Sequence, residues 1–285
     1  MNSDKIFSLQ RFSKADWLTL AYIFLWIVLI LLFSSFINQF KIFLLLHILS
    51  FLLCLFLSGI TPKTGFLKFL TKWYHYFLLP LLYAALHYLI PAIHPHSMDE
   101  VLIKIDFFLF GCHPTVWLEQ FYSPLLTEIL QLSYLVYYFM PLLILIPFYC
   151  RGDIEKFDRF SFIILLTFYC FFLGYVLFPA LGPRFYLAHL HTVSLEGKNI
   201  YHAICSLLNG LENIQWDAFP SGHVLVTIVF LYITKRYLPL VFYLTLPIAI
   251  LSIISTVYLR YHYVIDDLVG IILAGFVLLI AKKVN

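Results

Sequence analysis

Long apolar runs with almost no charged residues alternate with short polar segments along the whole chain. Each run is long enough to cross a bilayer, because a membrane-spanning helix needs roughly 20 apolar residues at about 1.5 Å per residue. We therefore predict an all-α fold, a polytopic integral membrane helix bundle of about eight transmembrane helices. The predicted helices are 16–37, 41–60, 75–93, 126–149, 160–180, 222–238, 240–257 and 264–281.

Composition and charge agree with this pattern. Of the 285 residues, 62% are hydrophobic and 12% are charged. With the N-terminus placed in the cytoplasm, 13 Lys and Arg residues fall in cytoplasmic segments and 5 in the opposite ones. Cytoplasmic loops carry the excess of positive charge in membrane proteins, so both termini are predicted to be cytoplasmic. The net charge of +3 follows from this bias, and no nucleic-acid partner is expected.

Two long segments, 94–125 and 181–220, are predicted on the extracytoplasmic side. We expect the first to lie along the membrane surface, because it is mildly amphipathic and interrupted by Pro and Gly. The second is rich in aromatic residues and has no polar tract, which indicates order. Cys112 and Cys205 fall in these segments and are predicted to be free thiols.

Three short motifs are predicted to meet on the extracytoplasmic side. His223 and His262 are 39 residues apart and bracket two predicted helices joined by a basic turn. Each helix of about 18 residues spans roughly 27 Å, so the chain crosses the bilayer and returns. Arg184 follows another helix that ends on this face. We therefore expect the two histidines and Arg184 to lie close together.

The spacing of His262 and Asp266 is i, i+4, which places both on one side of a helix. A carboxylate there can accept the Nδ1 proton of the imidazole and raise the basicity of Nε2. This arrangement suits a nucleophile that attacks phosphorus. A structural His–Asp pair at the start of the last helix fits the spacing equally well. The adjacent Asp267 is predicted to be a solvated carboxylate at the helix start.

The sequence PSGH at 220–223 precedes an apolar run and is typical of a helix start. Ser221 suits the N-cap position, and Gly222 allows a ligand to approach the backbone closely. Free N–H groups at a helix start attract anions. His223 could then donate a proton to a departing oxygen. For a single such histidine, an interfacial position without a catalytic role is the commoner alternative.

Arg184 and Arg260 are the two arginines in the predicted extracytoplasmic segments. A guanidinium group matches phosphate oxygens in a bidentate manner, so both are candidate phosphate ligands. The alternative is that each side chain extends from a helix end to the interface, which is favoured more for Arg260.

Taken together, these motifs resemble the type-2 phosphatidic acid phosphatase superfamily, whose second motif is PSGH and whose third is SR-x5-H-x3-D. The second motif matches in full, and His262 and Asp266 match the third, but Thr256 stands at its arginine position. The first motif, K-x6-R-P, is altered as well. Leu177 stands at the lysine, and the last two residues are reversed, with the proline before Arg184.

These departures resemble the inositolphosphotransferase branch, the relatives of inositol phosphorylceramide synthase, which carries P-R-F-Y, S-G-H and H-Y-x-x-D. The segment IDFFLFGCHP at 105–114 is similar to the D-x-x-L-F-G-x-x-P element of that branch. Sphingomyelin synthases share a similar S-G-H and H-Y-x-x-D pair. The resemblance covers roughly 100–281. It implies a phosphatase/phosphotransferase catalytic helix bundle at 96–285, preceded by N-terminal transmembrane helices of unassigned role at 1–95.

The resemblance implies His262 as a nucleophile that forms a phosphohistidine, with Asp266 as its orienting carboxylate. It implies His223 as the acid that protonates the leaving group. Arg184 is implied as a phosphate clamp, and no metal or other cofactor is expected.

Ser221 and Gly222 are the other candidate phosphate ligands, through the start of their helix. Because Thr256 cannot supply a guanidinium group, we expect Arg260 to replace the missing arginine from nearby.

The leading prediction is an integral membrane lipid phosphatase or phosphotransferase with its active site on the extracytoplasmic face. Its substrate would be a phosphorylated lipid or a head-group phosphodiester, and the acceptor would be water or an alcohol. Two other classes stay open: a metal-dependent membrane hydrolase, and a membrane transporter or structural protein without catalysis. Two His and one Asp also make a metal-binding triad, although nearby arginines repel a cation. Transporters usually carry ionisable residues at mid-helix, whereas this chain concentrates them at one rim.

Overall fold

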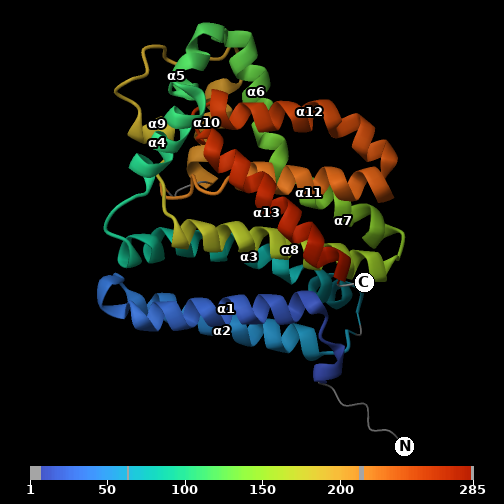
Figure 1. Cartoon of the computed structure of the whole chain (residues 1–285). Helices are drawn as coiled ribbons and strands as arrows, with labels where there is room; N and C mark the ends of the chain where they lie inside the picture. Colours follow the sequence, from blue (N-terminus) through green and yellow to red (C-terminus); the bar gives the residue numbers. More distant parts are fainter. Residues whose placement is uncertain (1–7, 63, 212–214, 284–285) are drawn as a thin grey trace, which may run out of the picture.

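The computed structural model describes residues 8–62, 64–211 and 215–283 and shows a bundle of helices (Figure 1). Seven helical segments in these ranges are long and apolar enough to span a membrane. They are α1 (Lys14–Leu32), α2 (Phe40–Gly59), α3 (Gly65–Ile93), the α6–η4–α7 segment (Pro124–Cys150), α8 (Ile154–Leu177), α12 (Pro239–Tyr258) and α13 (Val264–Lys283). No strand occurs within the described ranges, so the predicted all-helical membrane bundle is confirmed.

The remaining predicted span, 222–238, forms the shorter helix α11 (Gly222–Tyr237). Its 16 residues correspond to about 24 Å. α11 packs against α7, α8, α12 and α13, and most of its residues are buried. A short helix is sufficient at this position because protein, rather than lipid, surrounds it.

The segment after α3 forms a bent helix pair. α4 (Asp99–Phe110) and the α5–η3 segment (Pro114–Phe121) meet at an angle of 61°. The break falls at Gly111, whose φ of 68° is a left-handed conformation that favours glycine. With this pair counted as one broken span, the described ranges contain eight segments that are long and apolar enough to span a membrane.

One end of the bundle carries the polar motifs. Two backbone hydrogen bonds join them across the chain: Arg184 N–H donates to Arg260 O at 2.8 Å, and Ser221 N–H donates to Asp266 O at 3.1 Å. We name this end, with Arg184, Ser221 and His262, the motif end. In Figure 1 it lies at the upper left with α4, α5, α9 (Pro183–Tyr186) and α10 (Tyr201–Leu211), whereas the start of α1 and the end of α13 lie toward the right.

A short 3₁₀ turn, η4 (Tyr137–Phe139), interrupts the fourth span between α6 (Pro124–Val136) and α7 (Met140–Cys150). Pro141 lacks the N–H that would donate to the carbonyl four residues earlier, so a regular α-helix cannot continue here. The turn contacts α11, and it brings tyrosine side chains to the start of that helix.

Two glycines allow the PSGH turn to pack between α8 and α13. A Cβ atom at Gly174 in α8 would lie 2.3 Å from Cδ of Pro220. A Cβ atom at Gly270 in α13 would lie 2.8 Å from the carbonyl oxygen of Ser221. Any larger side chain at either position would therefore push the turn away from its neighbours.

The orientation of the bundle in the membrane remains a prediction from charge, and two free cysteines can test it. Cys112 lies in the turn between α4 and α5 at the motif end, and Cys150 is exposed at the end of α7. We expect a membrane-impermeant maleimide to label a Cys112-only variant on intact cells. A Cys150-only variant should react after permeabilisation alone. The opposite labelling pattern would place the motif end in the cytoplasm.

Candidate active site

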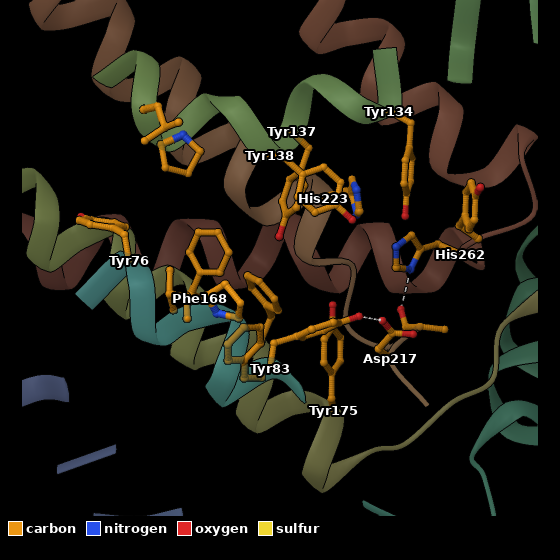
Figure 2. A pocket seen from close by; sticks show the side chains of 18 residues that line it. Tyr76, Tyr83, Tyr134, Tyr137, Tyr138, Phe168, Tyr175, Asp217, His223 and His262 are labelled. Atoms are coloured by element: carbon orange, nitrogen blue, oxygen red, sulfur yellow. Dashed lines mark hydrogen bonds between the residues drawn. The ribbon is translucent and has the colours of Figure 1, made fainter. Parts of the chain in front are cut away.

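A cavity of about 370 Å³ lies among α3, the α6–η4–α7 segment and α8 (Figure 2). Its polar end, at the motif end, is lined by Asp217, His223 and His262. From there it extends between aromatic and apolar side chains to Tyr76 and Leu79, near the middle of α3. A mostly apolar cavity with a few converging polar groups is typical of a site for a small molecule or a lipid.

The two predicted histidines meet in this cavity. The ring centroids of His223 and His262 are 5.9 Å apart, with an interplanar angle of 56°. His223 lies in the first turn of α11, and His262 lies in the loop that connects α12 to α13. At this separation both imidazoles can contact a single group of the size of a phosphate.

His223 is held between two tyrosine rings, as Figure 2 shows. The imidazole stacks on Tyr134 at 3.8 Å and on Tyr137 at 3.9 Å between centroids. Its Nε2 atom is buried and has no hydrogen-bond partner within the described part of the chain. The two stacked rings fix the plane of the imidazole at the start of α11.

His262 has a defined tautomer. Its Nδ1 lies 2.6 Å from the carbonyl oxygen of Ala218, and a carbonyl can only accept a hydrogen bond. The proton of the neutral ring is therefore on Nδ1, which leaves the lone pair on Nε2. Ala218 is itself fixed, because its N–H donates to Ala180 O at 3.0 Å. Burial lowers the pKa of His262, although Asp267 and the Ala218 hydrogen bond oppose this change.

The hydrogen bond expected between His262 and Asp266 is not formed. The Nδ1 atom of His262 is 3.6 Å from Oδ2 of Asp266, too long for a hydrogen bond, and Ala218 takes that position. Oδ2 of Asp266 instead accepts the N–H of Tyr263 at 2.8 Å. The carboxylate is thus a close electrostatic neighbour of the imidazole and fixes the backbone next to it.

The residues of the PSGH turn occupy the positions expected from the sequence. Ser221 is the N-cap of α11, and its Oγ accepts the N–H of Val224 at 3.4 Å. A Cβ atom at Gly222 would come within 3.0 Å of both Phe171 and the Tyr175 hydroxyl oxygen, two residues that line the cavity. The backbone at the start of α11 therefore lies directly behind the cavity wall.

Asp267 differs from its prediction, because it is buried rather than solvated. Its side chain lies between α12 and α13, where the residue is 7% exposed. Oδ2 of Asp267 accepts a hydrogen bond from Thr256 Oγ1 at 2.7 Å. Thr256 stands where the third motif has arginine, so at this position the structure has a hydroxyl–carboxylate pair in place of a cation.

The two candidate arginines have different surroundings. The guanidinium of Arg184 lies 5.6 Å from the ring centroid of Tyr261, which lines the cavity. The guanidinium of Arg260 is 2.9 Å from Oε1 of Glu119 and 2.7 Å from the carbonyl oxygen of Val193. The structure therefore places Arg184 next to the cavity. It does not place Arg260 at the missing third-motif arginine, because that side chain is already bound to the outer loops.

Two acidic residues of α4, not singled out in the sequence, hold the loops of the motif end. The carboxylate of Asp99 accepts the N–H groups of Leu181 and Gly182 at 2.8 and 2.9 Å. The carboxylate of Asp106 accepts the N–H groups of Val264 and Ile265 at 2.9 and 2.8 Å. Asp106 thus caps the helix that follows His262. Asp106 is the first residue of the D-x-x-L-F-G element, and this element is the sequence feature that could have identified it as a residue of the site.

Asp217 is a further cavity residue that the sequence did not reveal. Figure 2 shows a short hydrogen bond from the hydroxyl of Tyr83, in α3, to its carboxylate. Removal from bulk water raises the pKa of Asp217, and the Tyr83 hydrogen bond, His262 and Arg184 oppose this rise. Its contact with α3 joins residues 134 positions apart, which no local pattern indicates.

The metal-site alternative finds no support in the arrangement of donor atoms. Within the described residues, no three His, Cys, Asp or Glu side chains are grouped so that they could hold a metal ion. His223, His262 and Asp266 therefore do not form the facial triad that the alternative requires.

Comparison with known proteins assigns this chain to a family. The family model of the PAP2 superfamily matches residues 100–280, more than half of the chain. This chain belongs to the PAP2 superfamily. It is similar to a PA-phosphatase related-family protein of Dictyostelium discoideum, with 31% identity over 182 residues. That stretch covers 56% of this chain but 33% of the relative. No solved structure matches.

The superfamily predicted from the motifs is confirmed. The inositolphosphotransferase branch and the division of the chain at residue 95 stay predictions. Residues of α3 line the cavity, so that division does not separate the N-terminal helices from the candidate site.

A stabilising role of the Arg260–Glu119 ion pair can be tested by substitution. The two side chains are 12% and 9% exposed, so removing one partner leaves a largely buried charge. We expect Arg260→Ala and Glu119→Gln each to lower the unfolding free energy in detergent, by about 3 kcal/mol. The double variant should lose much less than the sum of the two. Additive losses, or a KM effect of Arg260→Ala without a loss of stability, would contradict this role.

Proposed function

We propose that this protein is an integral membrane lipid phosphatase or phosphotransferase, of the inositolphosphotransferase type, that works through a phosphohistidine intermediate. The observation that carries the proposal is the meeting of His223 and His262, 5.9 Å apart, at the polar end of an apolar cavity. An apolar cavity within a membrane bundle fits a lipid chain, and its polar end fits the attached phosphate. The substrate is a phosphorylated lipid or a head-group phosphodiester.

In the first step, Nε2 of His262 attacks phosphorus and forms an N–P bond. The P–O bond to the leaving group breaks, and His223 donates the proton that this oxygen needs. The Ala218 carbonyl keeps the other ring proton on Nδ1 of His262, and Asp266 at 3.6 Å stabilises the positive charge that develops on the ring. The stacked rings of Tyr134 and Tyr137 hold the His223 imidazole in position for this proton transfer.

In the second step, an acceptor hydroxyl attacks phosphorus, the N–P bond breaks, and the proton of the acceptor returns to His223. Water as acceptor gives a phosphatase, and an alcohol gives a phosphotransferase. The P-R-F-Y, H-Y-x-x-D and D-x-x-L-F-G elements of this sequence favour the alcohol.

Backbone N–H groups of the first turn of α11, beginning at Gly222, bind the phosphate oxygens, because a helix N-terminus favours anions. The N–H of Ser221 is donated to Asp266 O, so Ser221 contributes as the N-cap that begins this turn. Arg184 supplies a guanidinium group from beside the cavity. The positive-inside charge bias supports an extracytoplasmic position for this site. Membrane lipids are then both the surroundings and the substrates.

The covalent intermediate can be trapped directly. We expect wild-type protein, quenched during turnover of a ³²P-labelled phospholipid, to carry an acid-labile, alkali-stable label. His262→Ala should carry no label, and its turnover should be slower by at least about 10³-fold, because the nucleophile is missing. The control is His202→Ala, an exposed histidine on the same face, which should label normally.

Label retained in His262→Ala would overturn the phosphohistidine. The same assay with and without an added alcohol distinguishes the two acceptors. Release of free phosphate alone, with no labelled alcohol product, would exclude the phosphotransferase.

The pH profile tests the protonation state of the nucleophile. Attack requires neutral His262, and burial holds the pKa of His262 below its usual value of about 6.5. We therefore expect kcat/KM to stay high down to pH values below about 6.5 and to fall as the pH drops through the lowered pKa. An acid limb at or above pH 6.5, measured with a substrate that does not titrate there, is the contrary result.

A further inference from the structure

Asp217 places a carboxylate in the cavity beside the histidines. It lines the cavity next to Ala218, the residue whose carbonyl fixes His262. A carboxylate is an unusual wall for a site that binds phosphate, because like charges repel. The Asp217 carboxylate would therefore weaken the binding of a phosphate group more when that group carries more negative charge.

The position of this carboxylate is fixed from two directions. The backbone at Asp217 forms an isolated bridge with Ala180, at the end of α8. The side chain accepts the hydrogen bond from Tyr83, which lies on α3 and outside the region matched by the family model. Asp217 cannot swing away when a substrate enters without losing this hydrogen bond.

The charges around the cavity suit a phosphate with a single negative charge. Arg184 and, in the proposed first step, protonated His223 are the positive charges at the polar end, and Asp217 offsets one of them. Asp217 lies close enough to interact with both Arg184 and His262. Asp266 and Asp267 lie behind the histidine loop, 0% and 7% exposed. A phosphodiester carries one negative charge, whereas a phosphomonoester carries nearly two at neutral pH, because its second pKa is about 6.

We propose that Asp217, held by Tyr83, is a specificity-determining residue that selects a lipid phosphodiester over the corresponding phosphomonoester. The inference rests on the proposed function and deepens it by naming the substrate class. One more negative charge on the substrate within about 7 Å of this carboxylate, at an effective dielectric constant near 20, changes the relative rate by roughly tenfold or more.

The test compares two lipids with the same acyl chains in the same mixed micelles, with purified full-length protein. Phosphatidic acid is the monoester and phosphatidylinositol is the diester, and attack on either one by His262 releases diacylglycerol. The measured quantity is the ratio of the two kcat/KM values at about pH 7.5, where the monoester is mostly dianionic. A change in this ratio cannot come from a general loss of folding.

We expect the wild type to prefer phosphatidylinositol. Asp217→Asn keeps the shape of the side chain but removes its charge, so it should shift the ratio toward phosphatidic acid by about tenfold or more. Tyr83→Phe removes the hydrogen bond that holds the Asp217 carboxylate. It should shift the ratio in the same direction, but less than Asp217→Asn does. Glu196→Gln removes an exposed carboxylate from the loop at the motif end and should leave the ratio unchanged.

An unchanged ratio in both Asp217→Asn and Tyr83→Phe overturns the inference while leaving the proposed function intact. If Asp217→Asn does not fold, the ratio in Tyr83→Phe decides alone. Failure of the wild type to release diacylglycerol from either lipid overturns the proposed function itself.

Discussion

The close packing of the PSGH turn between α8 and α13 is the constraint on which the site depends. Gly174 and Gly270 leave no space for a Cβ atom, and the turn fills that space with Pro220 and the carbonyl of Ser221. Since His223 lies in the first turn of α11, directly after this PSGH turn begins the helix, its position follows from this packing. The loop before α13 carries His262, so the same contact fixes the distance between the two imidazoles.

Buried acidic groups organise much of the rest of the motif end. Asp99 accepts backbone N–H groups just before α9, Asp106 accepts those at the start of α13, and Asp267 accepts a hydrogen bond from Thr256. A carboxylate can accept several N–H groups at a helix start, so it replaces water that a loop at the membrane rim would otherwise need. The consequence is that carboxyl groups, rather than water, hold the loops and helix starts around the site.

Hydropathy was sufficient to predict the long apolar helices, because the bilayer imposes a minimum length on each of them. It did not predict the shorter helices α4, α5, α9 and α10. The meeting of His223 and His262 followed from counting residues through one hairpin. The contacts of Arg260 and Asp217 could not be predicted, since their partners are 141 and 134 residues away and lie on loops or other helices. Spacing also misjudged Asp266: the i, i+4 rule placed it near His262, but it could not show that the Ala218 carbonyl lies closer.

Two parts of the chain line the cavity: the region matched by the superfamily, and helix α3, which precedes it. The region matched by the superfamily supplies His223, His262 and the turn that fixes them, which are the groups that the proposed attack on phosphorus uses. The wall that faces them includes Tyr76 and Tyr83 of α3, which lies before that region. A change in α3 can thus alter which lipid fits, or how Asp217 is held, without touching the reacting groups. It follows that similarity over residues 100–280 can indicate the chemistry of this protein but leaves part of its substrate selection in helices outside that range.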